Sequence, residues 1–218
     1  MKMSRVLTVL AVSCLLLVPL RALEPPNLTV AKEAVIRYAE SGDYERDLAE
    51  VVGYAQDWMV ARVERRAEGE KLALVLDIDE TALSNLAHMR EMDFGYVPEH
   101  WDVWVANDIA PPIAPVLQLF RLARAHDVAV FFITGRREKD RPGTERNLQA
   151  VGYGDYAGLF LKPDASEKTT QAFKTDQRRK LEMAGWKIVA NLGVQRSDLA
   201  GGAAERFYKL PNPYYLIK

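Results

Sequence analysis

The sequence predicts an α/β fold in which a parallel sheet is covered by helices on both faces. Two observations lead to this prediction. Short, continuous apolar runs such as "LALVL" and "VAVFFIT" are typical of strands that are buried on both faces. Segments with the helical spacing of apolar residues alternate with these runs, as in a parallel sheet with crossover helices. At 218 residues and 49% hydrophobic composition, the chain is long enough for one such domain with a sizeable core.

The expected elements follow one another along the chain. Residues 23–30 are expected as an extended leader, and apolar positions at helical spacing predict a helix over 43–67, ended by Gly69. The first strand is "KLALVLDID", and residues 82–112 form an insert without clean periodicity. The later elements are helices over 113–126, 144–150 and 168–184, strands over 128–134, 158–162 and 186–193, and a fifth strand in "ERFYKL".

The first 22 residues have the pattern of a signal peptide. Lys2 and Arg5 form a charged start, residues 6–20 are almost wholly apolar, and a small residue follows at a suitable cleavage point. This run of fifteen residues between Arg5 and Arg21 is shorter than the roughly 20 that a membrane-spanning helix needs. Cys14 fits a lipid-attachment site poorly because the apolar run continues beyond it. We therefore expect an exported protein, periplasmic or secreted, whose mature domain of residues 23–218 has no membrane span.

Composition narrows the classes of function. The mature chain has no cysteine, so it has no disulfide framework, thiolate nucleophile or cysteine-ligated zinc. Without residues 1–22 it keeps 26 of its 29 basic residues against 30 acidic ones, a formal net charge of −4. With this charge and no long basic run, nucleic acid is not expected as a partner. His88, His100 and His126 have no ligand-like spacing and are expected as surface or packing residues.

Polar side chains follow three of the predicted strands, at the point where each strand ends. They are Asp77, Asp79 and Thr81 after the first strand, Thr134, Gly135 and Arg136 after the second, and Asn191, Gly193, Ser197 and Asp198 after the fourth. Lys174 lies on the helix that leads into the fourth strand. Because the carboxyl ends of parallel strands form the ligand-binding edge of such a sheet, we expect these residues to converge.

This combination suits a phosphate ester bound beside a divalent cation. A carboxylate that attacks a phosphate dianion meets like-charge repulsion, which a hard cation with oxygen ligands offsets. Of the pair Asp77 and Asp79, one stays ionised and attacks, while the other carries the proton for the leaving alkoxide and the hydrolytic water. Thr134 and backbone amides such as that of Gly135 can hold the transferring oxygens, and Lys174 can neutralise their charge.

Each of these residues also has an ordinary structural explanation. A lone D-x-D after a strand often caps a helix or forms an Asx-turn. Taken alone, Thr134 could be an ordinary strand residue and Arg136 could form a surface ion pair. Lys174 could be one of several lysines on a solvated helix face. The order of these residues and their common position at strand ends favour the functional interpretation.

With these motifs the chain resembles the acid phosphatase branch, subfamily IIIB, of the haloacid dehalogenase (HAD) superfamily. This branch includes plant acid phosphatases, vegetative storage proteins and secreted bacterial acid phosphatases. The matching stretches are "DIDETALSN", "FFITGRRE", Lys174 in "FKTDQRRKLEMAGWKIVAN", "GVQRSDLAGG" and "FYKLPNPYYLIK". The resemblance covers nearly the whole mature chain and implies a Rossmann-like three-layer sandwich with a small cap insert over about 82–112.

The resemblance also implies an activity and roles for individual residues. It implies a phosphomonoesterase that uses Mg²⁺ and an aspartyl-phosphate intermediate, acting on a small-molecule phosphate monoester. Asp77 would be the nucleophile and Asp79 the general acid/base. Thr134, Gly135 and Lys174 would bind phosphate. Mg²⁺ would be held by Asp77, the backbone carbonyl of Asp79 and an acid of the fourth motif, the stretch "GVQRSD" over 193–198.

The fourth motif departs from the family pattern. Members usually read G-D-Q-x-S-D, and here Val194 stands where the first acid would be a metal ligand. Valine offers no oxygen, so Asp198 or bridging water must compensate, and we expect a weaker Mg²⁺ site. The alternative is a catalytically weak or inactive storage or binding protein on the same fold. The presence together of Asp77, Asp79, Thr134 and Lys174 favours the enzyme.

Aromatic residues of the insert are the candidates for substrate selection: Phe94, Tyr96, Trp101 and Trp104. They either stack on a flat leaving group such as a nucleobase, as in a 5′-nucleotidase, or pack the insert onto the sheet. The i,i+3 spacing of the two tryptophans fits packing. Asn85 either orients substrate or caps a turn. A phosphotransferase that passes the phosphoryl group to an alcohol would need the same residues and an acceptor pocket.

Overall fold

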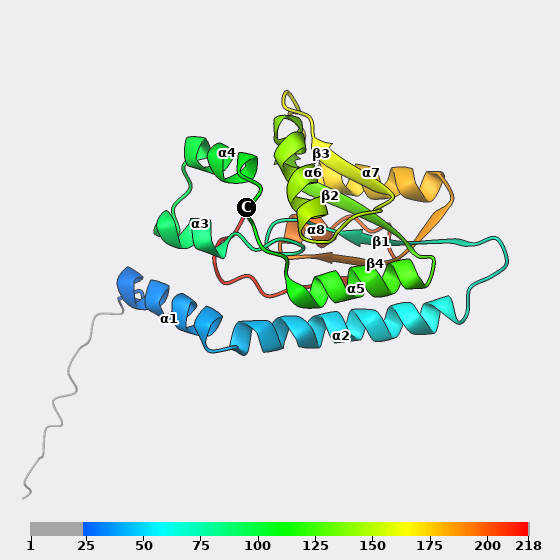
Figure 1. The fold of residues 1–218 in the computed structure, drawn as a ribbon, viewed down its shortest axis with the longest axis horizontal. Coiled ribbons are helices and arrows are strands. Elements are labelled where there is room, and N and C mark those ends of the chain that lie inside the picture. Colours follow the sequence, from blue (N-terminus) through cyan, green and yellow to red (C-terminus); the bar gives the residue numbers. More distant parts are fainter. Residues whose placement is uncertain (1–23, 218) are drawn as a thin grey trace, which may run out of the picture.

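The computed structural model describes residues 24–217, which form one five-stranded sheet with helices on both faces (Figure 1). The strands are β1 (Lys71–Leu76), β2 (Ala129–Arg137), β3 (Gly158–Lys162), β4 (Trp186–Gly193) and β5 (Phe207–Lys209). Their order in the sheet is β3-β2-β1-β4-β5, and every neighbouring pair is parallel. The expected α/β fold is confirmed. The signal peptide expected over residues 1–22, with Cys14, lies outside the described residues.

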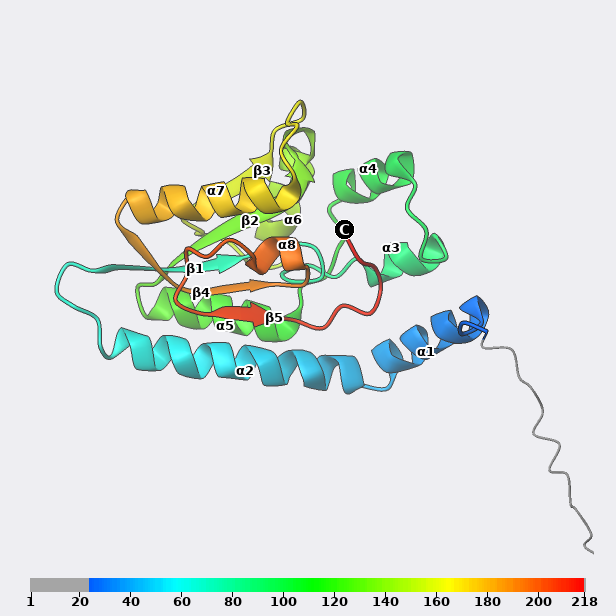
Figure 2. The same ribbon diagram turned by 180° about the vertical axis from the view of Figure 1, so that it is seen from behind.

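Helices cover both faces of the sheet or lie beside it (Figure 1). They are α1 (Leu28–Glu40), α2 (Asp43–Val63), α3 (Leu86–Glu91), α4 (Pro98–Ala106), α5 (Ala114–Ala125), α6 (Arg141–Ala150), α7 (Thr170–Met183) and α8 (Arg196–Leu199), with a 3-10 turn at Glu138–Asp140. Helices α2 and α5 lie on one face of the sheet and α7 on the other (Figure 2). Helices α1, α3 and α4 lie beside the sheet (Figure 1). No helix within residues 24–217 has the length and apolar character needed to cross a bilayer.

The side chains of β1 alternate between two separate cores, as the period of two in a strand requires. Leu72, Leu74 and Leu76 join the larger core together with residues of α2, α5 and α6. Ala73 and Val75 face the smaller core, which lies beneath α7. All five side chains are buried, so β1 is the central strand of a three-layer sandwich, and its carboxyl end is held rigidly.

Several expected boundaries are wrong. The extended leader expected over 23–30 ends at Asn27, because α1 begins at Leu28, where the Asn27 side chain accepts hydrogen bonds from the amides of Thr29 and Val30. No helix was expected over 31–40, although α1 packs part of its apolar face against the larger core.

The other differences lie at the ends of expected elements. The helix expected over 43–67 ends at Val63, the first strand ends at Leu76, and the helix expected over 144–150 begins at Arg141. Strand β2 continues beyond Thr134, its expected end, as far as Arg137.

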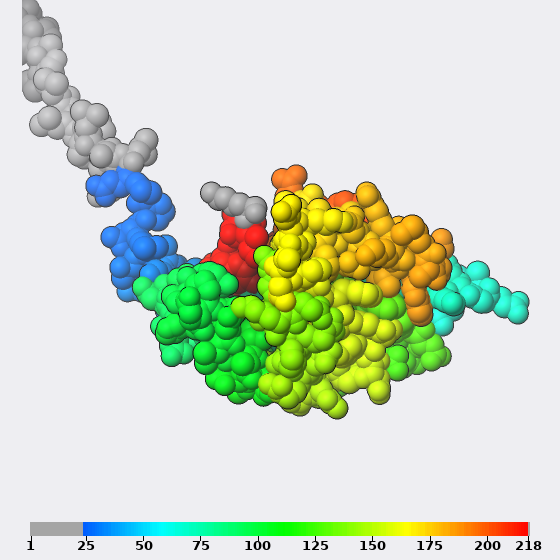
Figure 3. Space-filling view, turned by 90° about the horizontal axis from the view of Figure 1, so that it is seen from above, coloured from blue at the N-terminus to red at the C-terminus, as the bar shows by residue number. Residues whose placement is uncertain are grey.

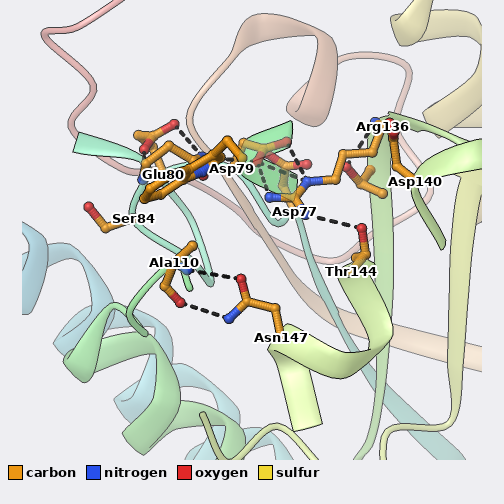
Figure 4. A network of polar contacts seen from close by, with 12 residues as sticks. Asp77, Asp79, Glu80, Ser84, Ala110, Arg136, Asp140, Thr144 and Asn147 are labelled. Carbon is orange, nitrogen blue, oxygen red and sulfur yellow. Dashed lines mark hydrogen bonds and ion pairs between the residues drawn. The ribbon is translucent and has the colours of Figure 1, made fainter. Parts of the chain in front are cut away.

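The insert over 82–112 supplies α3 and α4, which lie beyond one end of the sheet (Figure 1). Asn147 of α6 fastens its far end, because the Asn147 side chain accepts a hydrogen bond from the Ala110 amide at 3.1 Å and donates one to the Ala110 carbonyl at 2.8 Å (Figure 4). In the space-filling view the red C-terminal tail lies between the green insert and the yellow segment that leads into α7 (Figure 3).

Gly143 of α6 lies directly against α4 of the insert. A Cβ atom at Gly143 would lie 2.3 Å from the carbonyl oxygen of Val105, in α4. We expect Gly143→Ala to push α4 away and lower the free energy of unfolding by about 1–3 kcal/mol, measured by urea denaturation. Gly154→Ala is the control, because a Cβ there meets no atom within 4 Å. Equal losses in the two variants would contradict this packing.

Candidate active site

Asp77 lies where β1 meets its two neighbours at the carboxyl edge of the sheet. Its amide donates a hydrogen bond to the carbonyl of Leu192 in β4 at 3.0 Å, which fixes the main chain at this point. The chain crosses from the β2 side of β1 to the β4 side, so Asp77 stands at the switch point where open parallel sheets bind ligands. The Asp77 residue is 6% exposed.

Lys174 reaches from α7 to lie between two buried carboxylates. Its ammonium donates hydrogen bonds to Asp77 Oδ1 and, at 2.6 Å, to Asp198 Oδ1. Burial, and then the charge of Asp198, raises the pKa of Asp77, while Lys174 opposes the shift. Burial alone would lower the pKa of Lys174, but the two carboxylates outweigh it and raise that pKa well above its ordinary value. Lys174 therefore stays cationic and holds both acids in place.

Asp198 is held on its other side by the main chain. Its Oδ2 accepts hydrogen bonds from the amides of Val194 at 2.9 Å and Gln195 at 2.7 Å. The Val194 side chain is buried and belongs to the larger apolar core, and it does not line the cavity described below. The fourth motif therefore presents a single acid to the site.

Arg136 pairs with the second aspartate of the motif. Its guanidinium donates to Asp79 Oδ1 through Nη2 at 2.7 Å and through Nε at 3.1 Å, and to Thr144 Oγ1 at 3.0 Å (Figure 4). It also lies over the ring of Trp101, 5.5 Å from its centroid. The surface ion pair considered for Arg136 is wrong, because its side chain is only 2% exposed. Arg136 thus positions the Asp79 carboxylate.

Glu80 is a buried acid that the sequence analysis did not single out. Its backbone adopts the left-handed conformation with φ of 55°, which turns the side chain toward the insert and the C-terminal tail. It accepts hydrogen bonds from the Asn85 amide at 2.6 Å and from the Tyr215 hydroxyl at 3.0 Å. Burial, and then the charge of Asp79, raises the pKa of Glu80 to about 8. The available signal was its place inside the D-x-D-x-T motif.

Asn85 links Asp79 to the insert. Its side-chain amide donates to Asp79 Oδ1 at 3.0 Å and to Glu80 Oε2 at 3.2 Å, and its oxygen accepts from Trp104 Nε1 at 2.8 Å. Both amide hydrogens are therefore used within the protein, so Asn85 holds Asp79 and is not free to donate to a substrate. Trp104 in turn stacks on the buried His88 ring, with the centroids 5.4 Å apart.

These groups open into a cavity of about 450 Å³. The candidate site residues that line it are Asp77, Asp79, Asn85, Phe94, Tyr96, Trp101, Gly135, Lys174 and Asp198. Thr134 and Trp104 do not line it. Thr134 is fully buried and its hydroxyl accepts the Arg136 amide at 3.1 Å. Trp104 packs against the larger core.

The C-terminal tail forms the remaining wall of this cavity, through Tyr214, Tyr215, Leu216 and Ile217. The side chain of Gln195 binds the tail main chain, donating to the Tyr215 carbonyl at 3.2 Å and accepting from the Ile217 amide at 3.1 Å. Sequence reasoning considered Gln195 only as a weak neutral substitute for the metal ligand lost at Val194, and it missed the tail as part of the site. The "LPNP" stretch was used only as a family marker.

The side chains fit a divalent cation only in part. Within residues 24–217, no three or more carboxylate, histidine or cysteine side chains are grouped so that they could hold one ion. Asp198 already spends one oxygen on Lys174 and the other on two main-chain amides. The donors left include the second oxygen of Asp77, the Ser197 hydroxyl, which has no hydrogen-bond partner among the described residues, and main-chain carbonyls. A hard cation binds more weakly with fewer charged ligands.

The fold and the site together define a member of the HAD superfamily. The chain belongs to subfamily IIIB of this superfamily, the acid phosphatases, whose family model matches residues 22–218. The resemblance drawn from the motifs is thereby confirmed.

Known proteins show the same relationship. The chain is 36% identical over 148 residues to Acid phosphatase 1 of Solanum lycopersicum, covering 66% of this chain and 58% of that protein. It is 30% identical over 149 residues to Vegetative storage protein 1 of Arabidopsis thaliana, covering 66% and 54%. The match thus spans little more than half of these relatives. The solved class C acid phosphatase of Bacillus anthracis shares the fold, with a TM-score of 0.72, 22% identity, and coverage of 87% and 85%.

Proposed function

We propose that this protein hydrolyses phosphate monoesters of small molecules through an aspartyl-phosphate on Asp77. The observation that carries the proposal is the position of Asp77. It lines the cavity at the switch point of the sheet, beside the Lys174 ammonium and two residues before Asp79. The proposed nucleophile Asp77, the Lys174 ammonium and the Asp79 carboxylate thus lie close together, as a covalent phosphoryl transfer requires.

The reaction would have two steps. In the first, an Asp77 oxygen bonds to phosphorus as the bond to the leaving oxygen breaks, and Asp79 gives that oxygen its proton. In the second, Asp79 takes a proton from a water that attacks phosphorus, the bond to Asp77 breaks, and inorganic phosphate leaves. The Gly135 amide and Lys174 would bind the phosphate oxygens, and the buried Thr134 hydroxyl would do so only after a local shift.

A divalent cation, Mg²⁺, would be held by Asp77 and the main-chain carbonyl of Asp79. Asp198 could join them only by giving up one of its present hydrogen bonds, to Lys174 or to the main-chain amides. It would offset the repulsion between Asp77 and the phosphate dianion. Because the donor set is poor, we expect dialysis against EDTA to abolish activity and half-maximal recovery to need about 1 mM Mg²⁺. A second readout is the midpoint of thermal unfolding of the dialysed protein, measured as magnesium is added back. Full activity after dialysis would contradict this site.

The cavity favours esters with a flat or apolar leaving group. Phe94 and Tyr214 stack with centroids 6.4 Å apart, and Tyr96 and Trp101 complete the aromatic part of the wall. Nucleoside monophosphates and aryl phosphates are therefore the proposed substrates, which includes 5′-nucleotidase activity. Nucleic acid is not a proposed partner, and an exported, periplasmic or secreted location is proposed from residues 1–22 alone.

A rate survey tests this function. Phosphate release is measured from aryl phosphates, nucleoside monophosphates and sugar phosphates, with glycerol added in a parallel series to detect transfer to an alcohol. We expect hydrolysis with the highest kcat/KM for aromatic leaving groups. A transfer product that dominates over phosphate would favour a phosphotransferase. No turnover of any ester would favour the storage or binding alternative, which Val194 and the likeness to Vegetative storage protein 1 support.

A further inference from the structure

Arg178 of α7 is a buried charge that the proposed reaction does not use. Its side chain is 1% exposed and is the largest of the fully buried side chains. A buried guanidinium normally faces a carboxylate, because an unpaired buried charge is costly. Within residues 24–217, Arg178 makes no ion pair, so its hydrogen-bonding capacity is spent on other groups.

Three main-chain carbonyls of residues 198–202 converge on this guanidinium. This segment runs from the end of α8 into the turn that follows it and is called the 198–202 loop. Nη1 donates to the carbonyl of Asp198 at 2.7 Å, Nε donates to that of Gly202 at 3.0 Å, and Nη2 donates to that of Ala200. The fixed fork of an arginine can span several acceptors at once, which a lysine cannot do. Arg178 therefore gathers the loop over 198–202 around itself.

Further contacts give this loop one conformation. Gly201 has a φ of +90°, and a Cβ there would lie 2.3 Å from Thr175 Oγ1, so only glycine allows the loop to approach α7 so closely. The Thr175 hydroxyl donates to the Ala200 carbonyl at 3.0 Å. Asn191 of β4 adds a second donor to the Asp198 carbonyl at 2.9 Å.

Helix α7 thus holds Asp198 at two points. Lys174 binds its carboxylate, and Arg178, one turn further along the same helix, binds its carbonyl. This hold is important because Val194 leaves Asp198 as the only acid of the fourth motif at the site. If Asp198 moved, Lys174 would lose one of its two partners and its position beside Asp77.

We propose that Arg178 is a positioning residue for the proposed hydrolysis, acting through the main chain of Asp198 on the Lys174–Asp77 pair. The role of Arg178 in turnover rests on the proposed function, whereas its hydrogen bond to the Asp198 carbonyl does not. Arg178 does not line the cavity, so it has no direct contact with a substrate bound there.

Arg178→Lys tests this role because it keeps the charge and loses the fork. Hydrogen exchange of the amides of Val194 and Gln195, which bind Asp198 Oδ2, is expected to become about tenfold faster, with exchange in β1 unchanged. For the folded fraction, kcat for an aryl phosphate is expected to fall about tenfold. Arg179→Lys, at an exposed neighbouring position, is the control and is expected to change neither quantity.

A double-mutant cycle with Asp198→Asn separates positioning from a general structural role. If Arg178 acts through the Asp198 carboxylate, Arg178→Lys should lower kcat less than about twofold further in the Asp198→Asn background. The same tenfold loss in both backgrounds, or unchanged exchange at residues 194 and 195, overturns the proposal. Exchange needs no turnover, so an inactive wild type would refute the proposed hydrolysis while exchange still decides whether Arg178 holds Asp198.

Discussion

Asp77→Asn is expected to lower phosphatase kcat about a thousandfold or more while leaving the fold intact. The amide has almost the same shape as the carboxylate but is a very poor nucleophile toward phosphorus. Lys174 keeps its second partner, Asp198, at 2.6 Å, so the buried ammonium does not become unpaired. Removing one of two carboxylates that face a single cation also relieves repulsion, so the thermal midpoint should not fall.

The control for this variant is Asp57→Asn, on an exposed position of α2. It makes the same chemical change and should leave kcat and KM at wild-type values. Turnover mixtures of both proteins are quenched, digested and analysed by mass spectrometry. The peptide that contains residue 77 should carry a phosphoryl group in the wild type and none in the variant. Wild-type rates in Asp77→Asn would exclude this residue as the nucleophile.

Lys174→Met is expected to damage both stability and activity. The methionine nearly fills the same volume but leaves Asp77 and Asp198 as two buried carboxylates without their cation. Breaking a buried pair in this way costs about 3–5 kcal/mol in the free energy of unfolding. Activity should fall with it, because Lys174 no longer orients Asp77 or neutralises the bound phosphate.

The pH dependence of the Lys174→Met variant distinguishes lost charge from lost packing. Without the ammonium that opposes them, burial and the charge of Asp198 raise the pKa of Asp77 above its unfolded value. A carboxyl with a raised pKa stabilises the folded state more at low pH, and this stability is lost as the pH rises through the raised pKa. Urea denaturation across pH should therefore show a deficit that grows with pH. Lys180→Met, at an exposed position near the end of α7, should show none.

The strand-end residues of the site could be predicted because they follow local patterns. Asp77 and Thr134 each lie at the end of an apolar strand. This pattern predicts that both lie at the same edge of a parallel sheet. The expected α/β fold followed from those patterns too. Helix α1 was missed although Val35, Tyr38 and Ala39 recur at helical spacing and pack against the larger core, so the signal was present in the sequence.

The rest of the site depends on contacts between distant parts of the chain. Arg136 is buried only because Asp79 and Thr144 meet it from other elements. Arg178 holds Asp198 because the 198–202 loop bends back onto α7. No residue pattern in the sequence predicts that bend. The side chain of Asp198 was expected near a cation, and the structure adds that protein donors already occupy both of its oxygens.

The hydrogen bond between Tyr215 and Glu80 joins residues 135 positions apart in the sequence. Because the tail supplies one wall of the cavity, a chain shortened before Tyr214 would keep every proposed reacting group and lose that wall. Such a chain would hold the leaving group of a proposed substrate less well, although its reacting groups stayed in place.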